Sequence, residues 1–177
     1  MVMTPGIRKF ALTAHLTCSV GWIGAVMAYL VLVVAALMSP DSRTLQAVWI
    51  AMEVIGWYVI VPLALASLLT GLVMALGTQW GLFRHYWVVL SLVLTILATV
   101  VLLAHMQIVS DVASIAAETP RAAVNGLPSE LVHAGVGMLV LLVIQVLNMY
   151  KPRGMTPYGW HKQQEQRTMS PRPRRPV

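Results

Sequence analysis

Four uninterrupted apolar stretches constrain this 177-residue chain more than any other feature. They cover residues 10–38, 48–77, 86–109 and 131–150, and Glu53 is the only acidic or basic residue within them. About 20 apolar residues in a helix cross the roughly 30 Å hydrocarbon core of a bilayer. Only 10% of all residues are charged, against about 25% in a soluble domain. We therefore predict an all-α, polytopic membrane protein with four transmembrane helices.

Loop lengths and basic residues predict how these helices are arranged. Short connections at 39–47 and 78–85 make the first three helices antiparallel neighbours, and a longer loop leads to the fourth. The result is an up-down-up-down bundle. Ten of the twelve Lys and Arg residues lie on the side of the two termini. By the positive-inside rule, both termini are cytoplasmic.

The basic residues and the single cysteine exclude several other classes of protein. Residues 151–177 carry seven of the twelve Lys and Arg, so the basicity belongs to a tail and not to a folded nucleic-acid-binding face. We expect this tail to be disordered and to meet anionic lipid headgroups, or to serve only as a topology signal. Residues 1–150 form the single domain. Cys18, the only cysteine, excludes an intramolecular disulfide or a thiolate cluster.

Ionisable side chains inside the spans are the candidate functional residues, because such groups are costly in a bilayer. On this topology Glu53, His105 and His133 lie about 7.5, 6 and 3 Å inside the non-cytoplasmic ends of their helices. A carboxylate and two imidazoles at one depth suit copper or another transition metal. His105 and His133 on facing helices also suit a b-type haem iron, with His15 as an additional ligand. Alternatively, these groups are structural and bond neighbouring helices.

A second polar layer is predicted near the cytoplasmic side. On the first span one stripe should face the bundle interior, and it consists of His15, Cys18, Ser19 and Trp22. Ser91 and Thr95 on the third span are expected to bond across to that stripe, or back to carbonyls of their own helix. Gln145 and Asn148 belong to the same layer and are typical of groups that join helices.

Three segments carry a resemblance to known proteins. KFALTAHLTCSVGWIGAVMAYL, TGLVMALGTQWGLFRHYW and TVVLLAHM resemble an uncharacterised family of small bacterial four-helix integral membrane proteins. The similarity covers roughly residues 9–106 and implies a bacterial inner-membrane location without an assigned activity. His15, Trp22 and Gly24 are also similar to the first helix of copper-resistance D-type membrane proteins, which implies copper handling.

Three hypotheses about function follow. The chain is a haem-binding membrane protein, a copper or other transition-metal handling protein, or a non-enzymatic accessory protein that works with a membrane partner or as a homodimer. No Ser/His/Asp arrangement, glycine-rich phosphate loop or closely spaced acid pair indicates a catalytic residue. Whether the chain is an enzyme stays open at this point.

Overall fold

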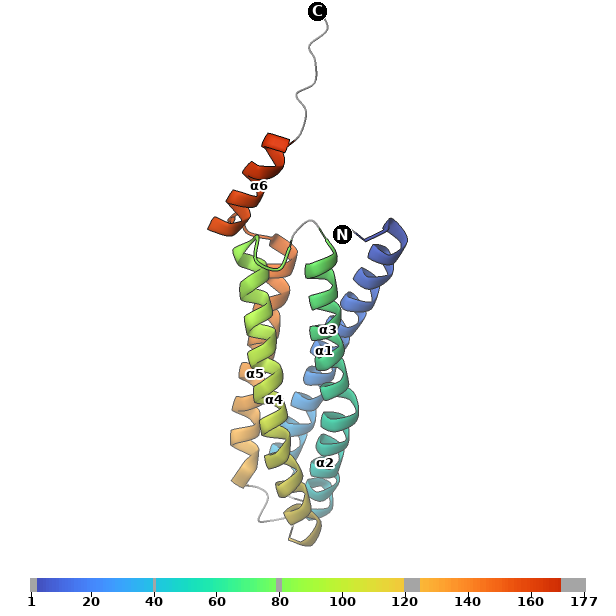
Figure 1. Ribbon diagram of the computed structural model, residues 1–177. Coiled ribbons are helices and arrows are strands. Elements are labelled where there is room, and N and C mark those ends of the chain that lie inside the picture. Colours follow the sequence, from blue (N-terminus) through green and yellow to red (C-terminus); the bar gives the residue numbers. More distant parts are fainter. Residues whose placement is uncertain (1–2, 40, 79–80, 120–124, 170–177) are drawn as a thin grey trace, which may run out of the picture.

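A computed structural model gives the fold as an antiparallel bundle of long helices (Figure 1). It describes residues 3–39, 41–78, 81–119 and 125–169. Four helical segments are long and apolar enough to cross a membrane. They are α1 (Pro5–Met38), the continuous run α2 (Ser42–Ile55), η1 (Gly56–Ile60) and α3 (Val61–Gly77), then α4 (Tyr86–Glu118) and α5 (Leu127–Tyr150). The prediction of an all-α polytopic bundle is confirmed.

The four segments close into a ring in which each lies beside the next. α1 packs against α3 and α5, while α4 packs against α2, α3 and α5. The first residues of α1 and the last residues of α5 lie at the same end of the bundle (Figure 1). We call this the basic end, because Arg8, Lys9, Arg84, Lys151 and Arg153 belong to the segments there. The other end is called the opposite end.

The helices extend further than the predicted spans. α1 begins at Pro5 and not at residue 10, α4 continues to Glu118 and not to 109, and α5 begins at Leu127 and not at 131. Hydrophobicity marks where a helix leaves the hydrocarbon, but the helix continues as long as its backbone bonds are made. The earlier start of α5 places Glu130 in its first turn.

A π-helical turn accommodates the proline in the second span. Pro62 lacks an N–H, and its ring would clash with a carbonyl of the preceding turn. In η1 the Val61 N–H donates to the Gly56 carbonyl, so the helix is wider just before the proline. Gly56 itself faces α4, and a Cβ there would overlap the Met106 side chain. The expected distortion at Pro62 is therefore a π-turn beside a close helix crossing.

The prediction of a disordered tail is wrong over part of its length, because α6 occupies Pro157–Met169. Thr156 begins this helix, since its hydroxyl accepts a hydrogen bond from the Gly159 N–H at 3.1 Å. The Thr156 N–H donates to the Arg84 carbonyl at 3.0 Å, and the Thr156 hydroxyl donates to the Phe83 carbonyl. The tail is thus tied to the loop that precedes α4. The remainder of the tail, residues 170–177, lies outside the described residues.

The tightly packed core lies in the half of the bundle nearer the opposite end. The α1 residues of this core begin at Trp22 and continue through Val33 to Ala36. Trp49 and Met52 of α2 are fully buried against them. Nearer the basic end, α1 buries only Ala11. The half of the bundle at the basic end is therefore less densely filled.

Candidate functional site

Four side chains from three helices meet near the opposite end, and we call them the Glu130 network. At its centre Glu130 is only 3% exposed. The Tyr29 hydroxyl donates to Glu130 Oε2 at 2.8 Å, and His105 Nε2 lies 3.0 Å from each carboxyl oxygen. The His133 ring stacks on the His105 ring, with centroids 3.6 Å apart and planes at 10°. The network therefore joins α1, α4 and α5.

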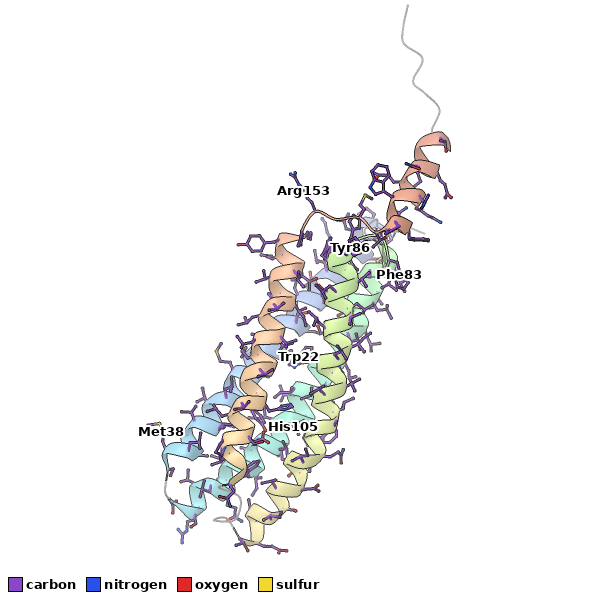
Figure 2. All side chains as sticks on the ribbon, turned by 90° about the vertical axis from the view of Figure 1, so that its left-hand side faces the viewer. Trp22, Met38, Phe83, Tyr86, His105 and Arg153 are labelled. Carbon is purple, nitrogen blue, oxygen red and sulfur yellow. The ribbon has the colours of Figure 1, made fainter. Side chains whose placement is uncertain are left out.

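Helix periodicity explains why two of these residues come together. Glu130 and His133 are three positions apart on α5, so both project from one face. Pro128 in the first turn of α5 starts the helix early enough to include Glu130. That face of α5 meets α4 at His105, which lies in the bundle interior on the Met38 side of Trp22 (Figure 2). The local sequence of α5 thus supplies the acid and one of the two stacked rings.

The arrangement satisfies the carboxyl group and leaves His133 available. The oxygens of a carboxylate only accept hydrogen bonds, so with Glu130 as a carboxylate the close Nε2 atom of His105 is the donor. A buried carboxyl group without such donors would be very costly. His133, by contrast, makes no hydrogen bond to the residues that the structure describes. Its ring nitrogens are therefore free to bond another molecule.

A cavity of about 440 Å³ lies directly beside the network, between α1, α4 and α5. Its lining continues along α5 from Glu130 to Leu141, a distance of about 16 Å along the helix. The wall is apolar apart from the network residues and the indole of Trp22. Val101 and Val136 line it and are about half exposed on the outside of the bundle. The cavity is thus an apolar groove with its polar groups at one end, open sideways between α4 and α5.

The structure brings together only some of the predicted site residues. His105 and His133 are in contact, but Glu53 is half-buried on α2 and has no hydrogen bond to them. Glu130 takes the place that the sequence analysis assigned to Glu53. Within the described ranges, no group of three or more His, Cys, Asp or Glu side chains is placed to hold a metal ion. His15 lies toward the basic end, away from this network.

The arrangement of His105 and His133 gives no support to a haem whose iron is bound by both imidazoles. Two axial ligands approach an iron atom from opposite faces of the macrocycle, whereas these rings lie in van der Waals contact with each other. Met52 and Met106, whose thioether sulfurs would suit copper, are packed as core side chains. Met52 is fully buried in the core, and Met106 packs against Gly56 with only 1% of its surface exposed. Their burial is that of gap-filling side chains.

His15 belongs to a second polar cluster, which joins α1 to α3. Its Nδ1 atom lies 3.2 Å from the Ser67 carbonyl oxygen and 3.1 Å from Thr70 Oγ1. The Ser19 hydroxyl donates to the His15 carbonyl at 2.8 Å and lies 2.9 Å from the Ser67 hydroxyl. Gly71 leaves room for the ring, because a Cβ there would come within 3.0 Å of His15 Cε1. This cluster confirms that the His15–Ser19 stripe faces the interior.

Two members of the Glu130 network were missed by the sequence analysis. Glu130 stands one residue before the predicted start of the fourth span, and Tyr29 was counted as part of an apolar run. The signal that would have found Glu130 is its spacing of three residues from His133. No protein-family model, curated protein or solved structure matches the chain. The functional argument therefore depends on the geometry of the site.

Proposed function

We propose that this multi-pass membrane protein binds a lipophilic molecule from the bilayer, with the Glu130 network holding its polar head. The observation that carries the proposal is the 440 Å³ groove whose polar lining is gathered at one end. Ligand sites of this kind have volumes of about 300–1,000 Å³, apolar walls and a few convergent polar groups. The lateral opening between α4 and α5 gives such a molecule a path from the lipid.

The depth of the network matches the orientation of an amphiphile. From Tyr86 to Gln107, α4 covers about 31 Å, close to the thickness of the hydrocarbon core. His105 would then lie near the boundary of that core, and the groove would lead from it toward the bilayer centre. An amphiphile in a membrane has its head at the boundary and its tail in the interior. The ligand would therefore enter without reversing its orientation.

The free ring of His133 indicates the chemistry of the head group. A neutral imidazole has one N–H donor and one acceptor nitrogen, so it bonds a carbonyl oxygen or a hydroxyl group equally well. The stack on His105 holds the ring in place, and Glu130 holds His105. A quinone or quinol head, which carries carbonyl or hydroxyl oxygens, fits these requirements. We take the short-chain benzoquinones as the probe of this class.

Orientation and location are part of the same proposal. The basic end carries Lys9, Arg84, Lys151 and Arg153, so the positive-inside rule favours a cytoplasmic basic end in a bacterial inner membrane. α6 is tied to that end and carries exposed Lys162, which favours contact of the tail with anionic headgroups. The Glu130 network would then lie at the non-cytoplasmic boundary.

Tryptophan fluorescence tests the binding proposal, because Trp22 lines the groove and quinones quench indole emission. We would titrate a short-chain benzoquinone into the detergent-purified protein. We expect saturable quenching that His133→Phe, which keeps a ring but loses both nitrogens, weakens by about tenfold in Kd. Trp22→Phe should remove much of the quenching while equilibrium dialysis still detects binding.

The matched control is His161→Phe, since His161 is exposed on α6 far along the chain from the groove. Quenching that does not saturate, or that is the same in His133→Phe and His161→Phe, would overturn the proposal and favour the accessory-protein hypothesis. The haem and copper hypotheses stay predictions with their own test. A Soret band or a stoichiometric metal ion in the same purified sample would favour one of them.

A further inference from the structure

A second cavity, of about 190 Å³, lies toward the basic end and takes no part in the proposed ligand site. It lies within the bundle where the core is less densely filled. Polar groups from all four long helices line it, among them His15, Ser19, Ser67, Ser91, Thr95 and Asn148. An interior space with this many hydroxyl, amide and imidazole groups is unlike the apolar cavities that stay empty of water.

Ser91 is the residue in this lining whose hydrogen bonding is incomplete. Its side chain is 7% exposed, and Oγ has no hydrogen-bond partner among the residues that the structure describes. The hydroxyls on the same face of α4 behave differently. Thr95 donates to the Ser91 carbonyl at 2.7 Å, and Thr99 donates to the Thr95 carbonyl at 2.8 Å. A buried hydroxyl without a partner, facing a cavity, indicates a bound water or another small polar molecule.

The Nε2 atom of His15 also lacks a hydrogen-bond partner among the described residues around this cavity. The Ser67 carbonyl only accepts, so the proton of a neutral His15 ring lies on Nδ1 and points at it. The Thr70 hydroxyl already donates to the Ala66 carbonyl at 2.6 Å, so it too accepts from Nδ1. Nε2 is then an acceptor without a protein donor in the described part of the chain. A water molecule in the cavity would supply that donor.

The lining of the cavity reaches the basic end of the bundle. Its lining includes Thr78, Trp87 and Lys151, which stand at the ends of α3, α4 and α5 on that side. Eight residues of α4 separate Trp87 from Thr95, so the cavity reaches about 12 Å inward. Beyond Thr95, Thr99 is buried to 3% exposure and does not line it. The cavity is therefore closed at its deep end.

We propose that this cavity is a water-filled vestibule, open at the basic end, that brings water and protons to His15 inside the bundle. Non-helical or polar surface at membrane depth is tolerated where it lines a water-filled space, and ionisable residues inside a membrane usually face one. The vestibule does not depend on a ligand in the groove beside Glu130. The two proposals are tested by separate measurements.

Cysteine accessibility tests the vestibule, and the single native cysteine makes the background simple. In a Cys18→Ala protein we would introduce Ser91→Cys and treat sealed vesicles with a charged, membrane-impermeant thiosulfonate. Thiols react as thiolates, which form readily only in contact with water. We expect Ser91→Cys to react from the basic-end side at least tenfold faster than Thr99→Cys, its matched control two turns deeper.

Two marker positions report the sidedness of the vesicles. Gln164 is exposed on α6, and Gln164→Cys marks the basic end. Ala47 is exposed on α2, and Ala47→Cys marks the opposite end. Thr95→Cys provides a second vestibule position if Ser91→Cys does not purify as a monodisperse protein. The proposal is overturned if the vestibule cysteines react no faster than Thr99→Cys, or if they react from the side that Ala47→Cys marks.

Discussion

The Glu130 network and the vestibule both hold polar groups inside the bundle, but the acid of the network and the hydroxyls around the vestibule are satisfied in different ways. In the network a carboxyl group takes donors from Tyr29 and His105, which belong to two other helices. In the vestibule the hydroxyls of Ser19 and Thr95, and beside it that of Thr70, each bond a carbonyl four residues earlier in their own helix. A buried acid needs partners from neighbouring helices, whereas a hydroxyl can be satisfied locally. Substitutions in the network should therefore cost far more stability.

The largest effect is expected for Glu130→Ala. Removing the carboxyl group leaves the Tyr29 hydroxyl and the His105 Nε2–H buried without their acceptor. Leaving buried donors without an acceptor costs about 1–3 kcal/mol of unfolding free energy, and we expect the upper end of that range because two donors lose their acceptor. Denaturant unfolding in detergent, followed by circular dichroism, measures the change.

Glu53→Ala is the control for that substitution. Glu53 is also an acid on a membrane-spanning segment, but it is half-buried and has no hydrogen bond to the network. We expect its replacement to cost less than about 1 kcal/mol. Equal losses in the two variants would contradict the assignment of Glu130 as the central acid and restore Glu53 as a candidate.

A smaller effect is expected for Tyr29→Phe, which removes one donor and keeps the packing of the ring. A hydrogen bond to a charged group contributes about 1.5–3 kcal/mol, and we expect the lower value because His105 still satisfies the carboxyl group. The double variant Tyr29→Phe with Glu130→Ala separates the pair energy from the rest. If the two losses simply add, the Tyr29 hydroxyl stabilises the protein through contacts other than its hydrogen bond to Glu130.

Much of the fold was predictable from the sequence because bilayer thickness dictates the length of an apolar helix. The spans over 10–38 and 48–77 fall within the observed helices, as do the other two. The relative level of side chains along the bundle was also readable, since His105 and His133, predicted to lie at one depth, are in contact. Rotation about the helix axis was readable on α1, where His15 and Ser19 mark the interior face, but not on the segments that offer no such polar stripe. Glu130 was not chosen because it stands one residue before the predicted start of the fourth span, whereas Glu53 lies inside a predicted span.

Asp41 provides a test of pH dependence outside both regions. It precedes α2, and its carboxylate accepts hydrogen bonds from the Thr44 N–H and hydroxyl, each at 3.1 Å. These bonds lower the pKa of Asp41 below its ordinary value. The stabilisation is therefore complete above the ordinary pKa of an aspartate, about 3.9, and is lost as the pH falls through the lower folded-state value.

When the unfolding free energy is measured as a function of pH, we expect a small loss at acid pH in the parent protein and no such loss in Asp41→Asn. The asparagine side chain can still cap the helix through its oxygen, so stability near pH 7 should change little. Asp41→Ala should lose the cap at every pH. If Asp41→Asn keeps the acid-dependent loss of the parent protein, that loss comes from another carboxyl group.

The smallest effect on stability is expected for Ser91→Ala, because Oγ has no protein partner to lose. We expect unfolding free energy within about 0.5 kcal/mol of the parent, in contrast with Tyr29→Phe. Ser91→Leu should also fold, since the cavity accepts extra methylene groups, but it should displace water. Thr95→Cys in that background should then react with the charged thiol reagent at least tenfold more slowly. A large loss of stability in Ser91→Ala would mean that this hydroxyl joins two helices, and the vestibule would then resemble the Glu130 network after all.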